Sequence, residues 1–146
     1  MKLITRDTDY AVRALCYITK QKKNIVSVTE LVRKLRIPRP FLRKILQVLN
    51  AKGILESHKG KGGGFVLTRA PKNISLVDLI ETFQGSFRLN ECFFKKIICP
   101  HRKGCSLKKA IDIIERRVIT DLKSISIASL IKGDKIYYGK KKNNYS

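Results

Sequence analysis

The 146-residue sequence predicts a mainly α-helical fold with one small β-hairpin. Three observations support this fold class. Apolar residues recur at helical spacing through most of the chain. A basic, glycine-rich turn separates two short strand-like segments near the middle. A longer apolar repeat between Leu107 and Leu122 has the three-and-four spacing of a helix that packs against another helix.

The first half of the chain carries signals for three helices. Apolar spacing predicts a first helix over residues 8–20. Ser27 and Glu30 form a capping-box pattern that begins a second helix, which we expect to end near Ile37. The prolines at 38 and 40 stop that helix, and a third should run from about Pro40 to Lys52. Its core-facing residues are expected to be Phe41, Ile45, Val48 and Leu49.

A hairpin should follow the third helix. The strand-like segments Ile54–His58 and Phe65–Arg69 flank the turn sequence KGKGGG over residues 59–64. Two helices joined by a tight turn and followed by a basic hairpin define a winged helix-turn-helix, which we assign to residues 1–74.

The second half should contain a loop and a long helix, which we assign together to residues 75–131. Ser75 and Asp78 cap a short helix that Gly85 ends. A cysteine-containing loop over 92–105 precedes a long helix from about Ser106 to Ser124, whose apolar repeat is typical of a helix–helix seam, with one further turn over 126–131. Residues 132–146 are rich in Lys and Asn, and we expect a basic, disordered tail.

The charge of the chain suits a polyanionic partner. There are 32 Lys and Arg against 11 Asp and Glu, for a net charge of +21. Between Lys20 and Lys72 we count 14 basic and two acidic residues, so charge and helix-turn-helix signals coincide. DNA, RNA and an anionic membrane surface all suit such a charge, and its coincidence with the helix-turn-helix signals favours double-stranded DNA. The sequence does not predict an enzyme, because it contains no paired carboxylates, nucleophile motif or catalytic metal motif.

Candidate DNA contacts lie on the third helix and on the hairpin. Arg39, Arg43 and Gln47 are candidates for base contacts, because Arg pairs well with guanine and Gln with adenine. Arg36 and Lys44 are candidates for phosphate contacts, which position a protein without specifying sequence. In the hairpin, the residues expected to enter a minor groove or follow the DNA backbone are His58, Lys59 and Lys61.

Three cysteines lie within a span of 14 residues, in the spacing C-x6-C-x5-C. Cys92, Cys99 and Cys105 predict a metal or cluster site, with three unligated thiols as the alternative. Zinc usually takes closer cysteine pairs, although His101 is a candidate fourth ligand. Iron–sulfur clusters also take thiolates. Cys16, on the first helix, is interpreted as a small buried apolar residue.

The chain is expected to be cytoplasmic, without membrane association. Its first residues lead directly into an amphipathic helix pattern rather than a signal peptide. No apolar run approaches the roughly 18 residues that a membrane span needs.

The sequence resembles the IscR/NsrR-type family of bacterial winged-helix transcription regulators over about residues 1–131. The opening TDYAVR, residues 8–13, is similar to the start of that family. The segment KGKGGGF, residues 59–65, resembles its RGxxGGY/F wing element. The three cysteines after Leu89 match its cluster-binding members.

The resemblance implies a homodimer formed through the long helix, bound to a palindromic operator with one winged helix per half-site. It implies an iron–sulfur cluster on Cys92, Cys99 and Cys105 that responds to nitric oxide, iron or cluster supply, or redox state. The IscR-like branch has a histidine where this chain has Lys108. The NsrR-like branch uses an aspartate from the other subunit, which Asp9 matches. The resemblance therefore favours a [4Fe-4S] cluster with Asp9 as fourth ligand over a [2Fe-2S] cluster.

We therefore expect a DNA-binding transcription regulator, most often a repressor in this family, controlled by its cluster. Two alternatives stay open. One is a winged-helix regulator whose loop holds structural zinc or acts as a thiol switch, which metal content distinguishes. The other is a basic protein that packages nucleic acid without sequence preference, which competition with random DNA at raised salt tests.

Overall fold

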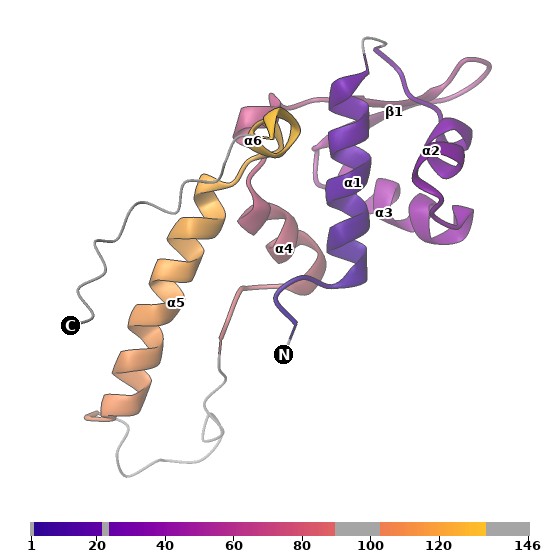
Figure 1. Ribbon diagram of the computed structural model, residues 1–146. Helices are drawn as coiled ribbons and strands as arrows, with labels where there is room; N and C mark the ends of the chain where they lie inside the picture. The colour runs from indigo at the N-terminus through magenta and orange to yellow at the C-terminus, as the bar shows by residue number, and fades with distance from the viewer. Residues whose placement is uncertain (1, 22–23, 90–102, 134–146) are drawn as a thin grey trace.

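The computed structural model describes residues 2–21, 24–89 and 103–133. Its elements are α1 (Arg6–Lys20), α2 (Val28–Leu35), α3 (Arg39–Ala51), β1 (Leu55–His58), β2 (Gly64–Leu67), η1 (Pro71–Asn73), α4 (Leu76–Gln84), α5 (Ser106–Ser124) and α6 (Ile127–Lys132). This arrangement confirms the predicted fold class. Figure 1 shows α1 to α4 and the hairpin gathered in one unit, with α5 extending away from it. Cys92, Cys99 and positions 134–146 of the predicted tail lie outside the described residues.

The first two helices begin and end close to the predicted positions. Helix α1 starts at Arg6, two residues before the predicted start, with Asp7 and Asp9 in its first turn. Both carboxylates lie where the positive end of a helix dipole favours negative charge. Helix α2 starts after Ser27, whose hydroxyl accepts a hydrogen bond from the Glu30 amide at 3.1 Å. It ends before the predicted Ile37, because Arg36 takes the left-handed conformation (φ 55°) that stops a helix.

The prediction of which α3 side chains fill the core was partly wrong. Ile45 and Leu49 are buried as expected, but Phe41 is 42% exposed and Val48 is only partly buried. The core positions are instead taken by Leu42, Ile45, Leu46 and Leu49. This set follows the i, i+3, i+4, i+7 spacing of one helix face, and Phe41 lies to one side of that face.

The hairpin pairs β1 with β2 in antiparallel register, with Leu55 opposite Leu67 and His58 opposite Gly64. Each strand is slightly shorter than predicted, at Leu55–His58 and Gly64–Leu67. Val26, just before α2, forms an isolated bridge with Phe65 through reciprocal backbone hydrogen bonds of 3.0 and 2.9 Å. This bridge fastens the hairpin to the beginning of α2.

Helix α1 is the central element of the larger core. Its residues Ala11, Ala14 and Leu15 are fully buried and pack with side chains of α2, α3 and the hairpin. Ile127 of α6 is buried in the same cluster, so the chain returns to the winged-helix unit after α5. The side chain of Gln84, at the end of α4, accepts hydrogen bonds from the Thr5 amide and the Thr8 hydroxyl and so joins α4 to the start of α1.

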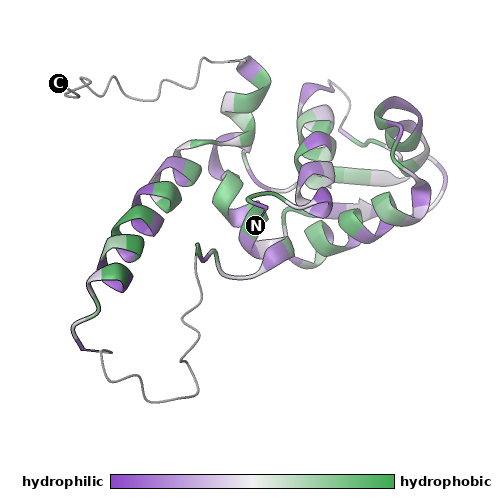
Figure 2. Ribbon diagram, turned by 60° about the horizontal axis from the view of Figure 1, so that its bottom comes forward, coloured by the Kyte–Doolittle hydropathy of each residue, from purple (hydrophilic) through white to green (hydrophobic). Residues whose placement is uncertain are grey.

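Helices α4 and α5 form a second, smaller core. Val77 and Ile80 of α4 pack with Leu122 of α5. The Ser75–Asp78 capping box and the bounds of α5 agree with the predictions. Much of α5 has no such cover, and Leu107, Ile113 and Ile114 are 69%, 44% and 47% exposed. Figure 2 shows hydrophobic residues continuing along α5 where it extends from the remaining helices.

Candidate nucleic-acid interface and metal ligands

Helix α3 presents the polar side chains that the sequence predicts for DNA contact. Arg43, Lys44 and Gln47 are all exposed, because the apolar residues of α3 face the core. A helix with a buried apolar side and an exposed basic side can lie in a major groove, where base edges and phosphates are both in reach.

Arg36 and Arg39 lie at the turn between α2 and α3, and both are exposed. Arg36 occupies the left-handed position that ends α2. Arg39 is the first residue of α3, and its Nη2 donates a hydrogen bond to Thr29 Oγ1 at 3.1 Å. This contact holds the guanidinium group across the turn while further N–H donors of Arg39 stay available for a ligand.

The basic side chains of the hairpin are carried on a tight turn. His58, Lys59 and Lys61 are exposed around it, and the Gly63 amide donates a hydrogen bond to the Gly60 carbonyl at 3.0 Å. A Cβ atom on Gly63 would lie 2.2 Å from the His58 carbonyl oxygen. The turn therefore requires glycine at this position and keeps the two lysines at the end of the hairpin.

A shallow hollow separates the hairpin from the start of α2 and the second half of α3. Its lining includes polar residues from all three elements: Ser27, Thr29, Gln47, Asn50, Ser57, His58 and Lys59. A helix N-terminus beside cationic side chains suits a phosphate group. Sequence reasoning missed Thr29, Asn50 and Ser57. Helical spacing from Arg43 and Gln47 could have found Asn50, whereas Ser57 joins the hollow only through the folding of the hairpin.

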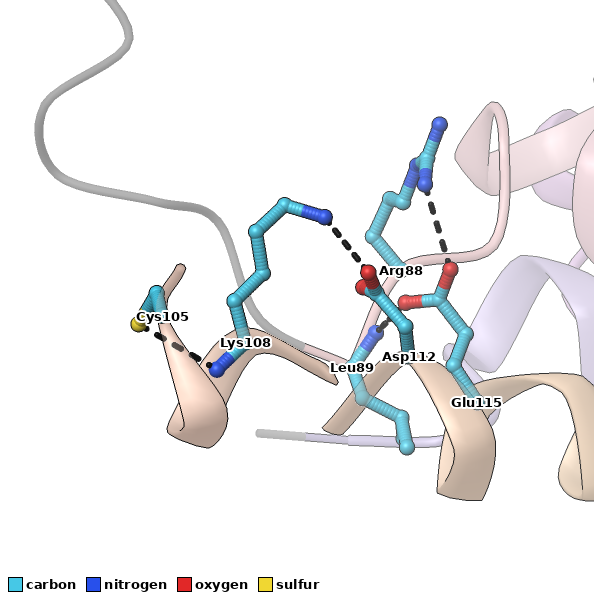
Figure 3. A network of polar contacts seen from close by, with 6 residues as sticks. All are labelled: Arg88, Leu89, Cys105, Lys108, Asp112 and Glu115. Carbon is cyan, nitrogen blue, oxygen red and sulfur yellow. Dashed lines mark hydrogen bonds and ion pairs between the residues drawn. The ribbon is translucent and has the colours of Figure 1, made fainter. Parts of the chain in front are cut away.

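Two of the four predicted metal ligands lie among the described residues. Cys105 is the N-cap of α5, partly exposed, and its sulfur accepts a hydrogen bond from the Lys108 amide at 3.4 Å (Figure 3). The Asp9 side chain is 44% exposed on α1 and pairs with Arg13 at 2.9 Å. Within residues 2–21, 24–89 and 103–133, no three His, Cys, Asp or Glu side chains come together as a metal site. Cys92 and Cys99 lie outside these ranges.

A buried carboxylate fixes the chain just before the cysteine segment. Glu115 of α5 is only 8% exposed, although it lies within the predicted apolar repeat. Its oxygens accept hydrogen bonds from the Leu89 amide at 2.9 Å and from Arg88 Nη1 at 3.2 Å (Figure 3). Helix α5 therefore holds both sides of the 90–102 segment, through Glu115 on one side and Cys105 on the other.

Two titratable side chains of α1 are perturbed by their surroundings. Burial raises the pKa of the Cys16 thiol, and nearby Lys20 partly offsets this effect. The partial burial of Cys16 against the main core agrees with its interpretation as a small apolar residue. The Tyr17 hydroxyl donates a hydrogen bond to Glu30 at 2.8 Å, which raises the pKa of Tyr17 and links α1 to α2.

An exposed basic helix beside a basic hairpin defines a winged helix-turn-helix DNA-binding regulator. The profile of the Rrf2 family, described as iron-dependent transcriptional regulators, matches residues 4–133, and the chain belongs to this family. As predicted, the family consists of regulators rather than enzymes. None of the helices in the described ranges is long and apolar enough to cross a bilayer.

Similar proteins agree with this assignment. An HTH-type transcriptional regulator of Aquifex aeolicus is 34% identical over 126 residues, covering 80% of this chain and 88% of that protein. The regulator NsrR of Shouchella clausii is 28% identical over 129 residues, covering 82% of this chain and 87% of its own. The solved structure of CymR, the global cysteine regulator of B. subtilis, superposes with a TM-score of 0.72 at 20% identity, covering 91% and 98% of the two chains.

Proposed function

We propose that α3 and the hairpin bind operator DNA, with Arg39, Arg43 and Gln47 reading bases. Arg36, Lys44, His58, Lys59 and Lys61 serve as the contacts to the sugar–phosphate backbone and the adjacent minor groove. The observation that carries this proposal is the exposed basic side of α3, next to a hollow that Gln47 and Asn50 of α3 share with His58 and Lys59 of the hairpin. A recognition helix and a wing on one surface can engage neighbouring parts of one duplex.

Selection of duplexes from a random pool, followed by binding assays, tests this interface. Arg43→Gln should relax base preference at one position of each half-site, because a bidentate contact to a guanine contributes about 1–3 kcal/mol of discrimination. Lys59→Gln should instead weaken binding to selected and random duplexes alike. A protein that binds both kinds of duplex equally at raised salt would favour the packaging alternative and contradict an operator-specific regulator.

We propose that the protein is a repressor, and that it acts as a homodimer on a palindromic operator. Helix α5 leaves Leu107, Ile113 and Ile114 substantially exposed, an arrangement that a second copy of the helix would cover. A two-fold dimer places one winged helix on each half-site, at a spacing that the dimer fixes. Binding to the chromosomal DNA of a bacterium requires a cytoplasmic location, which we also infer.

The donor set fits an iron–sulfur cluster. Cys105 is partly exposed at the N-terminus of α5, and the Asp9 side chain is 44% exposed and pairs with Arg13. We propose that Cys92, Cys99 and Cys105 hold the cluster together with Asp9 of the partner subunit. A [4Fe-4S] cluster is favoured over [2Fe-2S]. When bound, such a cluster supplies reactivity toward nitric oxide and oxygen and sensitivity to iron or cluster supply.

The chain's own contacts suggest how the cysteine segment controls DNA binding. Cys105 begins α5, and Glu115 ties Leu89 to the same helix. Loss of the cluster would free Cys105 from ligation. This change would act directly on α5, the helix that we propose joins the subunits. Because half-sites have a fixed separation, a small shift between the two α5 helices would lower operator affinity.

Anaerobic purification with iron, sulfide and zinc analysis tests the cofactor. Near-stoichiometric iron and sulfide with broad visible absorption would support the cluster, and zinc alone would favour a structural zinc site. Cys99→Ala should abolish both the absorption and the ligand-dependent change in DNA binding. Cys16→Ala is the matched control and should keep both. No metal after reconstitution would leave a winged-helix regulator with a thiol switch as the remaining alternative.

A further inference from the structure

Arg6 and Phe41 form an unusual exposed pair at the junction of α1 and α3. Arg6 is the first residue of α1, and its guanidinium carbon lies 4.6 Å from the centre of the Phe41 ring. Phe41 is in the first turn of α3 and is 42% exposed, on a helix whose other large apolar residues are mostly buried. The aromatic side chain therefore does not serve the core and instead carries the Arg6 cation.

This cation–π contact leaves the N–H donors of Arg6 available to bind an anion. A guanidinium group stacks through its flat face, whereas its five N–H donors lie in the plane of the group and point outward. Among the described residues, Arg6 makes no ion pair or side-chain hydrogen bond. The acidic residue one turn further along α1, Asp9, is occupied by Arg13 at 2.9 Å. Arg6 is thus a positioned cation with unused donors.

The position of this cation beside the first turn of α3 points to a DNA phosphate as the anion. The hairpin hollow includes Gln47 and Asn50 in the second half of α3, whereas Phe41 lies in its first turn. Asn50 follows Phe41 by nine positions, or about 13.5 Å along a helix. This span is comparable to the roughly 12 Å width of a major groove, so residues at the two ends of α3 can lie near different phosphates. Figure 1 shows the hairpin and the N-terminal end of α1 at opposite ends of the winged-helix unit.

We propose that Arg6, held by the Phe41 ring, is a further DNA-binding residue that contacts a backbone phosphate on the side of the recognition helix away from the wing. The proposal rests on the proposed use of α3 and the hairpin for DNA binding. Phe41 is a positioning residue for Arg6 and touches no DNA itself. The pair extends the interface beyond the second half of α3 and explains the exposed aromatic ring.

Salt dependence of binding separates a phosphate contact from a purely structural contact between helices. We would measure the affinity of the full chain for a random-sequence duplex by fluorescence anisotropy between 50 and 200 mM KCl. Arg6→Gln should weaken binding several-fold and make the slope of log affinity against log salt shallower by about 0.9 for each Arg6 on the DNA. Lys123→Gln, which removes an exposed charge in the last turn of α5, is the charge-matched control and should leave the slope unchanged.

A double-mutant cycle tests the role of the ring. Phe41→Leu keeps an apolar side chain but removes the aromatic face, so Arg6→Gln should have little further effect in the Phe41→Leu background. An equal effect of Arg6→Gln in both backgrounds would overturn the positioning role.

An unchanged salt slope in Arg6→Gln, with a shallower slope in Lys59→Gln, would overturn the phosphate contact and keep the proposed interface. Unchanged slopes in both variants would overturn the interface itself. Unfolding temperatures equal to that of the parent chain would show that the variants are folded.

Discussion

Arg36 combines a strained backbone with a proposed phosphate contact, so its two roles can be separated. It is the only non-glycine residue with positive φ in the described ranges. The left-handed conformation costs a residue with a Cβ about 1–2 kcal/mol, which glycine does not pay. Glycine also makes the unfolded chain more flexible, and this added entropy offsets part of the gain in stability.

We expect Arg36→Gly to raise the free energy of unfolding by about 0.5–1 kcal/mol while lowering DNA affinity. Urea unfolding and DNA titration measure the two effects. Arg33→Gly is the matched control, because Arg33 lies inside α2 and glycine there should lower stability by about 0.5–1 kcal/mol. Equal losses of stability in the two variants would contradict a strained position at Arg36.

The reactivity of Cys16 follows from its burial. Burial raises the pKa of its thiol more strongly than Lys20 lowers it, so less thiolate is present near neutral pH than in an unfolded chain. We expect alkylation of Cys16 by iodoacetamide at pH 7.5 to be several-fold slower in the folded protein than in urea, as followed by peptide mass spectrometry. Equal rates in both conditions would be evidence against this burial. Because folding raises the pKa of this thiol, Cys16 does not lower the free energy of unfolding at neutral pH. It does lower that free energy as the pH rises through the ordinary thiol range and above it.

At the scale of elements, the attachment of the hairpin depends on the closeness of Gly64 to the strand-like segment before α2. A Cβ atom on Gly64 would lie 2.3 Å from the Val26 carbonyl oxygen, where two backbone hydrogen bonds join Val26 to Phe65. We expect Gly64→Ala to lower the free energy of unfolding by about 1–3 kcal/mol, because backbone must move to admit the methyl group. Gly104→Ala, with no atom within 4 Å of the new Cβ, should be nearly neutral. Thermal unfolding compares them, and similar melting temperatures would argue against the tight packing.

The elements that sequence alone predicted well are those fixed by local signals. Ser75 with Asp78 begins α4, and the apolar repeat places α5 at Ser106–Ser124 as expected. The exposure of Arg43, Lys44 and Gln47 was also predicted, because helical spacing alone puts them on one side of α3, while their contacts to DNA stay a prediction. Where helical spacing is compatible with two adjoining faces, as at Phe41, the local pattern does not predict which residues are buried.

Contacts between distant segments could not be predicted in this way. Gln84 binds Thr5 and Thr8 across 79 and 76 residues, and Arg39 meets Thr29 across a turn whose shape depends on Arg36. Neither contact has a sequence pattern, because both depend on how completed helices pack. The buried Glu115 is similar, since its partners lie beyond the cysteine segment. The candidate metal ligands at Cys92 and Cys99 stay a prediction.

At the scale of the whole molecule, α5 is the element through which two copies of the chain can meet. Its side toward α4 is covered by Val77 and Ile80, whereas Leu107 and Ile114 remain open on the adjoining side. Exposed apolar residues of this kind are stabilised when a partner covers them, at roughly 25 cal/mol per Å² of apolar surface removed from water. A two-fold interface uses each residue twice, so one substitution acts at two symmetric places.

We therefore expect Ile114→Glu to weaken self-association by tenfold or more, which corresponds to about 1.4 kcal/mol or more, because it brings a carboxylate into an apolar interface. Sedimentation velocity over a concentration series measures this change. Arg116→Glu, which helical spacing places about 160° around α5 from Ile114, alters charge even more and should leave the dimer in place. The Ile114→Glu protein should keep weak binding to a single half-site while losing its preference for a palindrome, because the winged-helix unit does not depend on α5 contacts with a second copy. A dimer unaffected by Ile114→Glu would mean that the subunits meet through another surface.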